Sequence, residues 1–173
     1  MGSEWMHTLD IDGKTPLDRA CASGHAAIAD LMLRQEKDDQ SMALSGATPL
    51  HRAAYLGLTG AVKSLLTYGS AEEVRDESGE SPLHKASRQG HAETVEVLAR
   101  VGDVNAVCNN GMTPLHWAAI AGRDDVVQQL LLHGADPTIR NESMDGLSPV
   151  EIARALGYTE VENVLDSSRA FAV

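Results

Sequence analysis

The sequence predicts an all-α solenoid of five helix–turn–helix repeats with projecting β-turn loops. Two observations lead to this fold class. A motif of the type Thr-Pro-Leu-His recurs five times, and its prolines are 33, 33, 32 and 35 residues apart; the glycines keep the same register. A fixed period of this length is typical of stacked units that bury their apolar faces only against their neighbours. The motif copies begin at Thr15, Thr48, Ser81, Thr113 and Ser148.

The first helix of each repeat is expected to begin at the motif. The Thr or Ser hydroxyl suits the N-cap, and proline suits the first helical turn, where its missing N–H has no partner to lose. A glycine ends this short helix in every repeat. These glycines are Gly24, Gly57, Gly90, Gly122 and Gly157.

A second helix follows, because apolar residues recur at i, i+3 and i+4. A turn with glycine after Asp, Ser or Asn then leads to the next motif, a pairing that suits a positive φ. The apolar triplets are Val62, Leu65 and Leu66; Val95, Leu98 and Ala99; and Val127, Leu130 and Leu131.

These features resemble the ankyrin repeat, a turn and two antiparallel helices in about 33 residues. The resemblance covers roughly residues 7–166 and implies a concave groove lined by the first helices, with the turns projecting as fingers. Asp18 and Glu151 depart from the motif histidine. The segment 103–105 also resembles the acceptor of an asparaginyl hydroxylase, although the alternative is that Asn105 bonds its own turn.

We expect the five repeats to cover about 7–37, 38–70, 71–102, 103–135 and 136–166, between an N-terminal extension (1–6) and a C-terminal tail (167–173). Polar residues at Arg154, Glu162 and Asp166 replace the apolar ones of earlier repeats. This pattern indicates that the fifth repeat is a terminal cap. Trp5 and Leu9 either fold over the first repeat or once met a further neighbour.

The amino-acid composition also indicates the cellular compartment. The chain has only two cysteines, in different slots of the repeat, and no apolar run long enough for a membrane span. We therefore expect no disulfide and a cytoplasmic or nuclear location. The net charge of −11 disfavours duplex DNA and anionic membranes as partners, because phosphate contact needs a cationic field.

Nothing in the sequence predicts catalysis, a cofactor or a small-molecule substrate. His51, His84 and His116 occupy equivalent sites in successive repeats, about 10 Å apart. A metal needs its ligands within roughly 2.3 Å of one point. We therefore expect each imidazole to bond its own motif hydroxyl and a backbone group nearby, and no metal to bind.

The candidate binding residues depart from the framework on the groove side. Positions one and four past the motif histidine place a basic and aromatic patch across repeats two to four, rich in the residue types of binding hot spots. The alternative is that the aromatic and apolar members pack between helices and the basic ones only aid solubility. The candidates are Arg52, Tyr55, Leu56, Lys85, Arg88, Met112, Trp117, Ile120, Glu77 and Glu80.

The fingers are expected to carry acidic charge and a few exposed apolar side chains. The acidic residues gather near the third motif, and a charge run of this kind can also be a solvated face with no partner. The apolar candidates lie beside turn glycines. The acidic set is Glu72, Glu73, Asp76, Glu77 and Glu80, and the apolar set is Leu44, Met112 and Leu147.

The sequence therefore predicts a module that binds another protein, either a peptide segment or a helix, as an adaptor or scaffold. Two alternatives stay open. The chain is either a regulatory or substrate-recruiting domain of a larger enzyme or channel, or an inhibitor that masks its partner.

Overall fold

A computed structural model describes residues 46–67, 74–142 and 146–170. It also describes nine isolated positions, which are 10, 11, 16, 19, 20, 23, 25, 28 and 32. Most of the predicted first repeat, including Asp18, and the extension 1–6 lie outside these residues, as do Leu44, Glu72 and Glu73.

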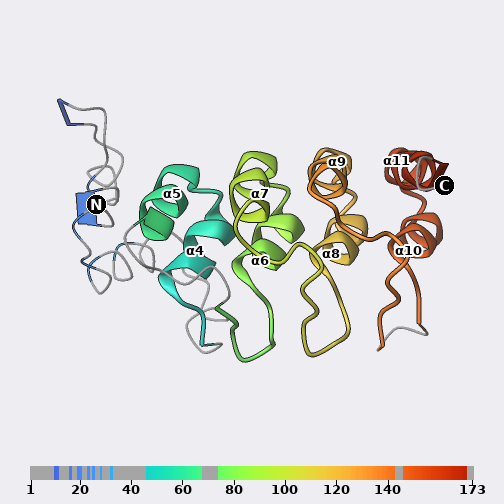
Figure 1. Ribbon diagram of the computed structural model, residues 1–173, viewed down its shortest axis with the longest axis horizontal. Helices are drawn as coiled ribbons and strands as arrows, with labels where there is room; N and C mark the ends of the chain where they lie inside the picture. Colours follow the sequence, from blue (N-terminus) through green and yellow to red (C-terminus); the bar gives the residue numbers. More distant parts are fainter. Residues whose placement is uncertain are drawn as a thin grey trace.

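The described part of the chain is an all-α repeat solenoid. Its helices alternate between two rows, one of first helices and one of second helices, and the fingers extend from the row of first helices (Figure 1). The first helices are α4 (Pro49–Leu56), α6 (Pro82–Gln89), α8 (Pro114–Ile120) and α10 (Pro149–Leu156). The second helices are α5 (Thr59–Thr67), α7 (Ala92–Ala99), α9 (Asp124–Leu132) and α11 (Thr159–Ala170).

The boundaries follow the predicted punctuation. Each first helix has its motif Thr or Ser at the N-cap in extended backbone, and Pro at the first turn. Gly57 ends α4 with φ +69°. Two ends differ from the prediction. Helix α8 ends at Ile120 with Ala121 at its C-cap, one residue before Gly122, and α11 continues to Ala170.

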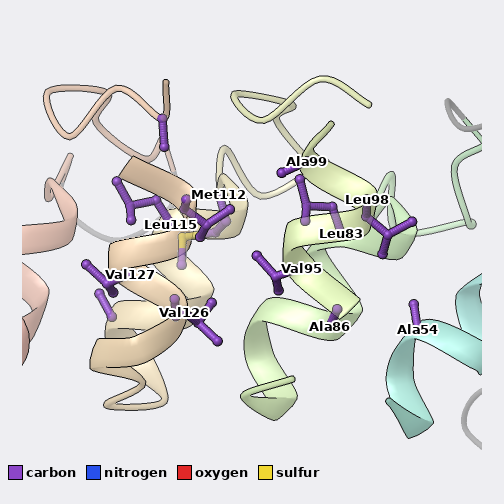
Figure 2. Close-up of a cluster of buried hydrophobic side chains, with 14 of the residues drawn as sticks. Ala54, Leu83, Ala86, Val95, Leu98, Ala99, Met112, Leu115, Val126 and Val127 are labelled. Atoms are coloured by element: carbon purple, nitrogen blue, oxygen red, sulfur yellow. The ribbon is translucent and has the colours of Figure 1, made fainter. Parts of the chain in front are cut away.

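One continuous apolar core runs along the array. Each first helix packs against the next first helix and its own second helix. Ala54, Ala86 and Ala119 are fully buried, and such small side chains let neighbouring helices approach closely. Figure 2 shows Val95 in one repeat and Leu115 in the next within the same buried cluster.

The motif histidines connect each repeat to the next. The backbone N–H of the N-cap residue donates to the histidine Nδ1, at 3.2 Å for His51, 3.0 Å for His84 and 3.1 Å for His116. The motif hydroxyl lies 2.8–2.9 Å from the same nitrogen. Since Nδ1 must therefore accept, the proton of the neutral ring sits on Nε2.

Each Nε2–H donates to a backbone carbonyl just before the next motif. The acceptors are Glu80 O at 2.9 Å for His51, Met112 O at 3.1 Å for His84 and Leu147 O at 3.3 Å for His116. The bond to the motif's own hydroxyl and to a nearby backbone group was predicted, and it is confirmed. The sequence did not indicate that the backbone group belongs to the following repeat.

In the fifth repeat Glu151 occupies the position of the motif histidine and accepts the hydrogen bonds from the N-cap residue of its own helix. Its Oε2 accepts from the backbone N–H of Ser148 at 2.8 Å and from the Ser148 hydroxyl at 2.9 Å. Its Oε1 lies 2.9 Å from Arg140 Nη2. The Ser148 N–H and hydroxyl, followed by Arg140, lower the pKa of Glu151 to about 2. A carboxylate thus supplies the acceptor that the imidazole supplies in the earlier repeats.

A second contact between repeats uses the glycine at the end of the first helix. The His91 ring lies against Gly57, where an added Cβ would lie 2.6 Å from His91 Nδ1. His91 Nε2 bonds Tyr55 O at 3.0 Å. Arg123 and Tyr158 lie against the corresponding glycines of the next two repeats. The glycine is therefore required both for the turn and for the close packing of the following repeat.

Mild acid should destabilise the array through the motif histidines. Burial lowers the pKa of His84 from 6.5 to about 4, and burial also lowers the pKa values of His51 and His116. At a pH between about 4 and 6.5 the unfolded chain binds more protons at His84 than the folded chain does. The free energy of unfolding is therefore fully present above pH 6.5 and decreases as the pH falls. For His84 the loss between pH 7 and pH 5 should be about 2 kcal/mol.

Urea unfolding at pH 7 and pH 5 measures this change in the free energy of unfolding. His84→Gln should lower stability at pH 7 and remove about 2 kcal/mol of the pH-dependent loss. The control Gln128→Ala, at an exposed residue of α9 that does not titrate, should leave the loss unchanged. An equal pH dependence in the wild type and His84→Gln would contradict the assignment.

Candidate functional site

One side of each first helix is not used by the core, and this is the side on which the groove was predicted. In α4 the residues Leu50, Ala53 and Ala54 are buried in the core. Tyr55 and its equivalents Arg88 and Ile120 lie in the last turn of their helices and are half-buried. They form a row, one residue per repeat, which we call the groove row.

The ten predicted binding residues have different environments. Tyr55, Leu56, Arg88, Trp117 and Ile120 are half-buried, and Glu77 is exposed. The other four are buried, and they are Arg52 at 5% exposure, Lys85 at 5%, Glu80 at 5% and Met112 at 2%. The structure therefore brings a smaller and less basic set to the groove than the sequence suggested.

Lys85 is withdrawn from the surface by two carboxylates. Its Nζ forms ion pairs with Asp76 Oδ2 at 2.7 Å and with Glu80. The Oδ1 of Asp76 accepts the backbone N–H groups of Ser78 and Glu80, both at 2.9 Å. Burial alone would raise the pKa of Asp76, but the Lys85 ammonium and the Glu80 N–H outweigh it, so the pKa is lowered. The expectation that Lys85 adds free positive charge to the groove was wrong.

Two other predicted residues are buried for different reasons. Arg52 Nη2 donates to Ala47 O at 3.2 Å, which ties the guanidinium to its own finger. Met112 was expected to be exposed beside a turn glycine, but it belongs to the buried cluster and lies beside Leu115 (Figure 2). The Met112 carbonyl accepts both His84 Nε2 and Cys108 N, which closes the finger over its side chain.

The acidic character of the finger is also reduced. Asp76 and Glu80 are buried with Lys85, and Glu77 is exposed. The Glu77 carbonyl accepts from Asn109 Nδ2 at 3.0 Å, so neighbouring fingers are held together by side-chain bonds to the backbone. The fingers of the third and fourth repeats are therefore linked to each other.

Among the predicted binding residues that are not buried, Arg88 and Trp117 contact each other. The Arg88 guanidinium carbon lies 5.1 Å from the centroid of the Trp117 ring. Its nearest carboxylate oxygen is Glu80 Oε1 at 3.9 Å, which is too long for a hydrogen bond. Stacking on an aromatic face orients the planar guanidinium without using its N–H donors.

The groove becomes more apolar toward the fifth repeat. Trp117 and Ile120 are followed by Leu156 at the end of α10, which is 52% exposed. Sequence analysis missed Leu156; the available signal was an apolar residue at the position of the predicted Leu56. The arrangement thus offers a cation next to a row of apolar side chains.

Asn105 connects two repeats. Its backbone N–H donates to Asp103 Oδ1 at 2.9 Å, within its own turn. Its side-chain Nδ2 donates to Gly134 O at 3.2 Å, and its Oδ1 accepts from Asp136 N at 2.8 Å. The amide therefore links the turns that open the fourth and fifth repeats, a role that was not predicted.

Within residues 46–67, 74–142 and 146–170 and the isolated described positions, no three His, Cys, Asp or Glu residues gather as a metal site. The same part of the chain contains no helix of the length and apolarity that would cross a bilayer. The polar groups that it buries serve mainly to hold repeats together.

The repeated helix pair, the finger and the motif hydrogen bonds define a module of stacked helical repeats. The family model described as ankyrin repeats (3 copies) matches residues 2–76 and 50–141. The chain belongs to the ankyrin-repeat family. Ankyrin repeats are non-catalytic domains that bind other proteins.

Individual relatives share part of this chain. The E3 ubiquitin-protein ligase hecd-1 of Caenorhabditis elegans is 36% identical over 83 residues, which is 45% of this chain and 3% of that protein. The BTB/POZ domain and ankyrin repeat-containing protein NOOT1 of Medicago truncatula is 43% identical over 67 residues, 37% of this chain and 14% of that protein. The 2-5A-dependent ribonuclease of Mus musculus is 47% identical over 60 residues, 34% of this chain and 8% of that protein.

Removing the buried ammonium should be far more harmful than removing an exposed one. Lys85→Met leaves two buried carboxylates without their cation and should cost about 3–5 kcal/mol of unfolding free energy. Lys63, whose 3.3 Å pair with Glu93 is 57% and 69% exposed, is the matched control. Lys63→Met should cost less than about 1 kcal/mol. Similar losses for the two variants in urea unfolding would contradict the structural role of Lys85.

Proposed function

We propose that the groove row, with Trp117 and Leu56 beside it, binds a peptide segment or a surface helix of a partner protein, and that the chain acts as an adaptor or scaffold. The observation that carries this proposal is the alignment of Tyr55, Arg88 and Ile120 across three successive repeats. Each side chain is held by a rigid first helix and is partly open to solvent.

The composition of this surface supports binding. Trp, Tyr and Arg are the residue types that most often dominate interface energetics. Because their positions are fixed by packing between repeats, the module loses little conformational entropy when a partner binds. The finger that precedes α6, on which Glu77 is exposed, would contact the edge of the partner.

The chain's own contribution is proposed to be recognition rather than chemistry. The matched part of the chain covers at most 19% of the length of these relatives. They are hecd-1, NOOT1 and two putative E3 ubiquitin-protein ligases of Arabidopsis thaliana. This small coverage favours a second candidate function, in which the chain is the regulatory or substrate-recruiting part of a larger protein. The same groove would serve both functions.

We place this activity in the cytoplasm or the nucleus. Cys108 is a buried free thiol, and buried thiols are retained in reducing compartments. The net charge of −11 supports protein rather than nucleic acid or membrane as the partner.

Site-specific photocrosslinking tests the groove. A benzoylphenylalanine at Ile120 should crosslink a partner in cell extract, whereas one at Gln128, exposed on α9, should not. The partner segment identified by mass spectrometry should then bind Ile120→Glu at least about tenfold more weakly, a loss of about 1.4 kcal/mol.

The control variant Gln128→Glu should bind that segment as the wild type does. Circular dichroism and thermal unfolding establish that both variants are folded. Equal crosslinking from the two positions, or equal weakening by the two substitutions, would show that the partner binds elsewhere on the solenoid.

A further inference from the structure

One cation of the groove differs from the others in its surroundings. Arg52 and Lys85 are buried, but the Arg88 side chain is 36% exposed. Within the described part of the chain, the Arg88 guanidinium donates no hydrogen bond, and Glu80 Oε1 lies 3.9 Å away. Glu80 is already paired with the Lys85 ammonium. The five N–H donors of Arg88 are therefore available to a ligand.

Trp117 prepares this guanidinium for a planar ligand. The guanidinium carbon lies over the ring, 5.1 Å from its centroid, in a cation–π contact that uses none of the N–H donors. A carboxylate can accept two parallel N–H bonds from the plane of the guanidinium.

The local charge favours a monoanion over a phosphate. Asp76, Glu80, Lys85 and Arg88 form a cluster with two negative and two positive charges. Phosphate groups in protein recognition are usually bound by several cations together. Only one cation of this cluster is open to the groove, and the whole chain carries −11. A single carboxylate matches this site better than a dianion does.

The side chains beyond Arg88 indicate what accompanies the carboxylate. Ile120 lies one repeat farther along the groove row, and Leu156 lies at the end of the following first helix. Neighbouring helices are about 10 Å apart, which an extended chain spans in about three residues. A large apolar side chain about three residues from the acid would therefore reach Ile120.

We propose that Arg88, stacked on Trp117, is the carboxylate-binding point of the groove, and that the partner is an extended segment with Asp or Glu about three residues from a large apolar residue. The inference rests on the proposed function, because it names the partner of that groove. It adds a sequence requirement that groove binding alone does not impose.

Selection from a random peptide library displayed on phage tests the requirement with the whole chain as bait. Wild-type protein should enrich peptides with Asp or Glu at one fixed distance from Leu, Ile, Phe or Trp. Arg88→Gln should lose the acidic preference and keep the apolar one. The control Arg100→Glu, at an exposed arginine that follows α7, should enrich the same peptides as the wild type.

Affinities of one enriched peptide and its Glu→Gln form complete the test. The wild type should bind the Gln form about tenfold more weakly, and Arg88→Gln should bind both forms equally. Thermal unfolding shows whether each variant is folded. Arg88→Lys should recover only part of the discrimination, because an ammonium lacks the planar pair of donors.

The outcomes separate the two proposals. The carboxylate site is wrong if the enriched peptides require Ile120 but show no acidic preference. It is also wrong if the acidic preference persists in Arg88→Gln. Either result leaves the groove proposal in place. A phosphoserine peptide that binds more tightly than the Glu peptide overturns the choice of carboxylate. If no enriched peptide depends on Ile120, the peptide groove itself is wrong.

Discussion

The neutral motif imidazole is the interaction on which the rest of the structure depends. In each of three repeats its Nδ1 accepts the N-cap N–H, which fixes the start of the first helix, and its Nε2–H reaches the carbonyl before the next motif. One side chain therefore sets both the position of its own helix and the position of the next finger. The spacing of the first helices, and with it the groove row, follows from this bond and from the continuous core beneath it.

Two cations on the same helix, Lys85 and Arg88, have different environments. Lys85 and Arg88 lie one turn apart on α6, yet Lys85 is buried between Asp76 and Glu80, whereas Arg88 remains partly exposed over Trp117. Burying a charge is costly unless it is paired and hydrogen-bonded, and the cluster satisfies this condition. Lys85 thus holds the third finger against its helix, and Arg88 is left for recognition.

Most of the fold could be predicted because the period of the sequence and the physics of helix ends give the same answer. Proline, N-cap hydroxyl and terminal glycine place each first helix, and the i, i+3, i+4 pattern places each second helix. The candidate site could be predicted only in part. Counting positions along a helix indicates which side chains share a face, but it does not show that Asp76 reaches Lys85 or that a closed finger covers Met112. Those contacts depend on how the loops fold back, which the repeat pattern does not encode.

Nitrogen-15 NMR of the histidine rings tests the central claim most directly, since it reports the tautomer and the protonation of each imidazole. The structure predicts that His51, His84 and His116 are neutral with the proton on Nε2 at pH 7, and that His84 titrates near pH 4 rather than 6.5. Protons on Nδ1, or titration of His84 close to pH 6.5, would show that the imidazoles do not connect the repeats in this way.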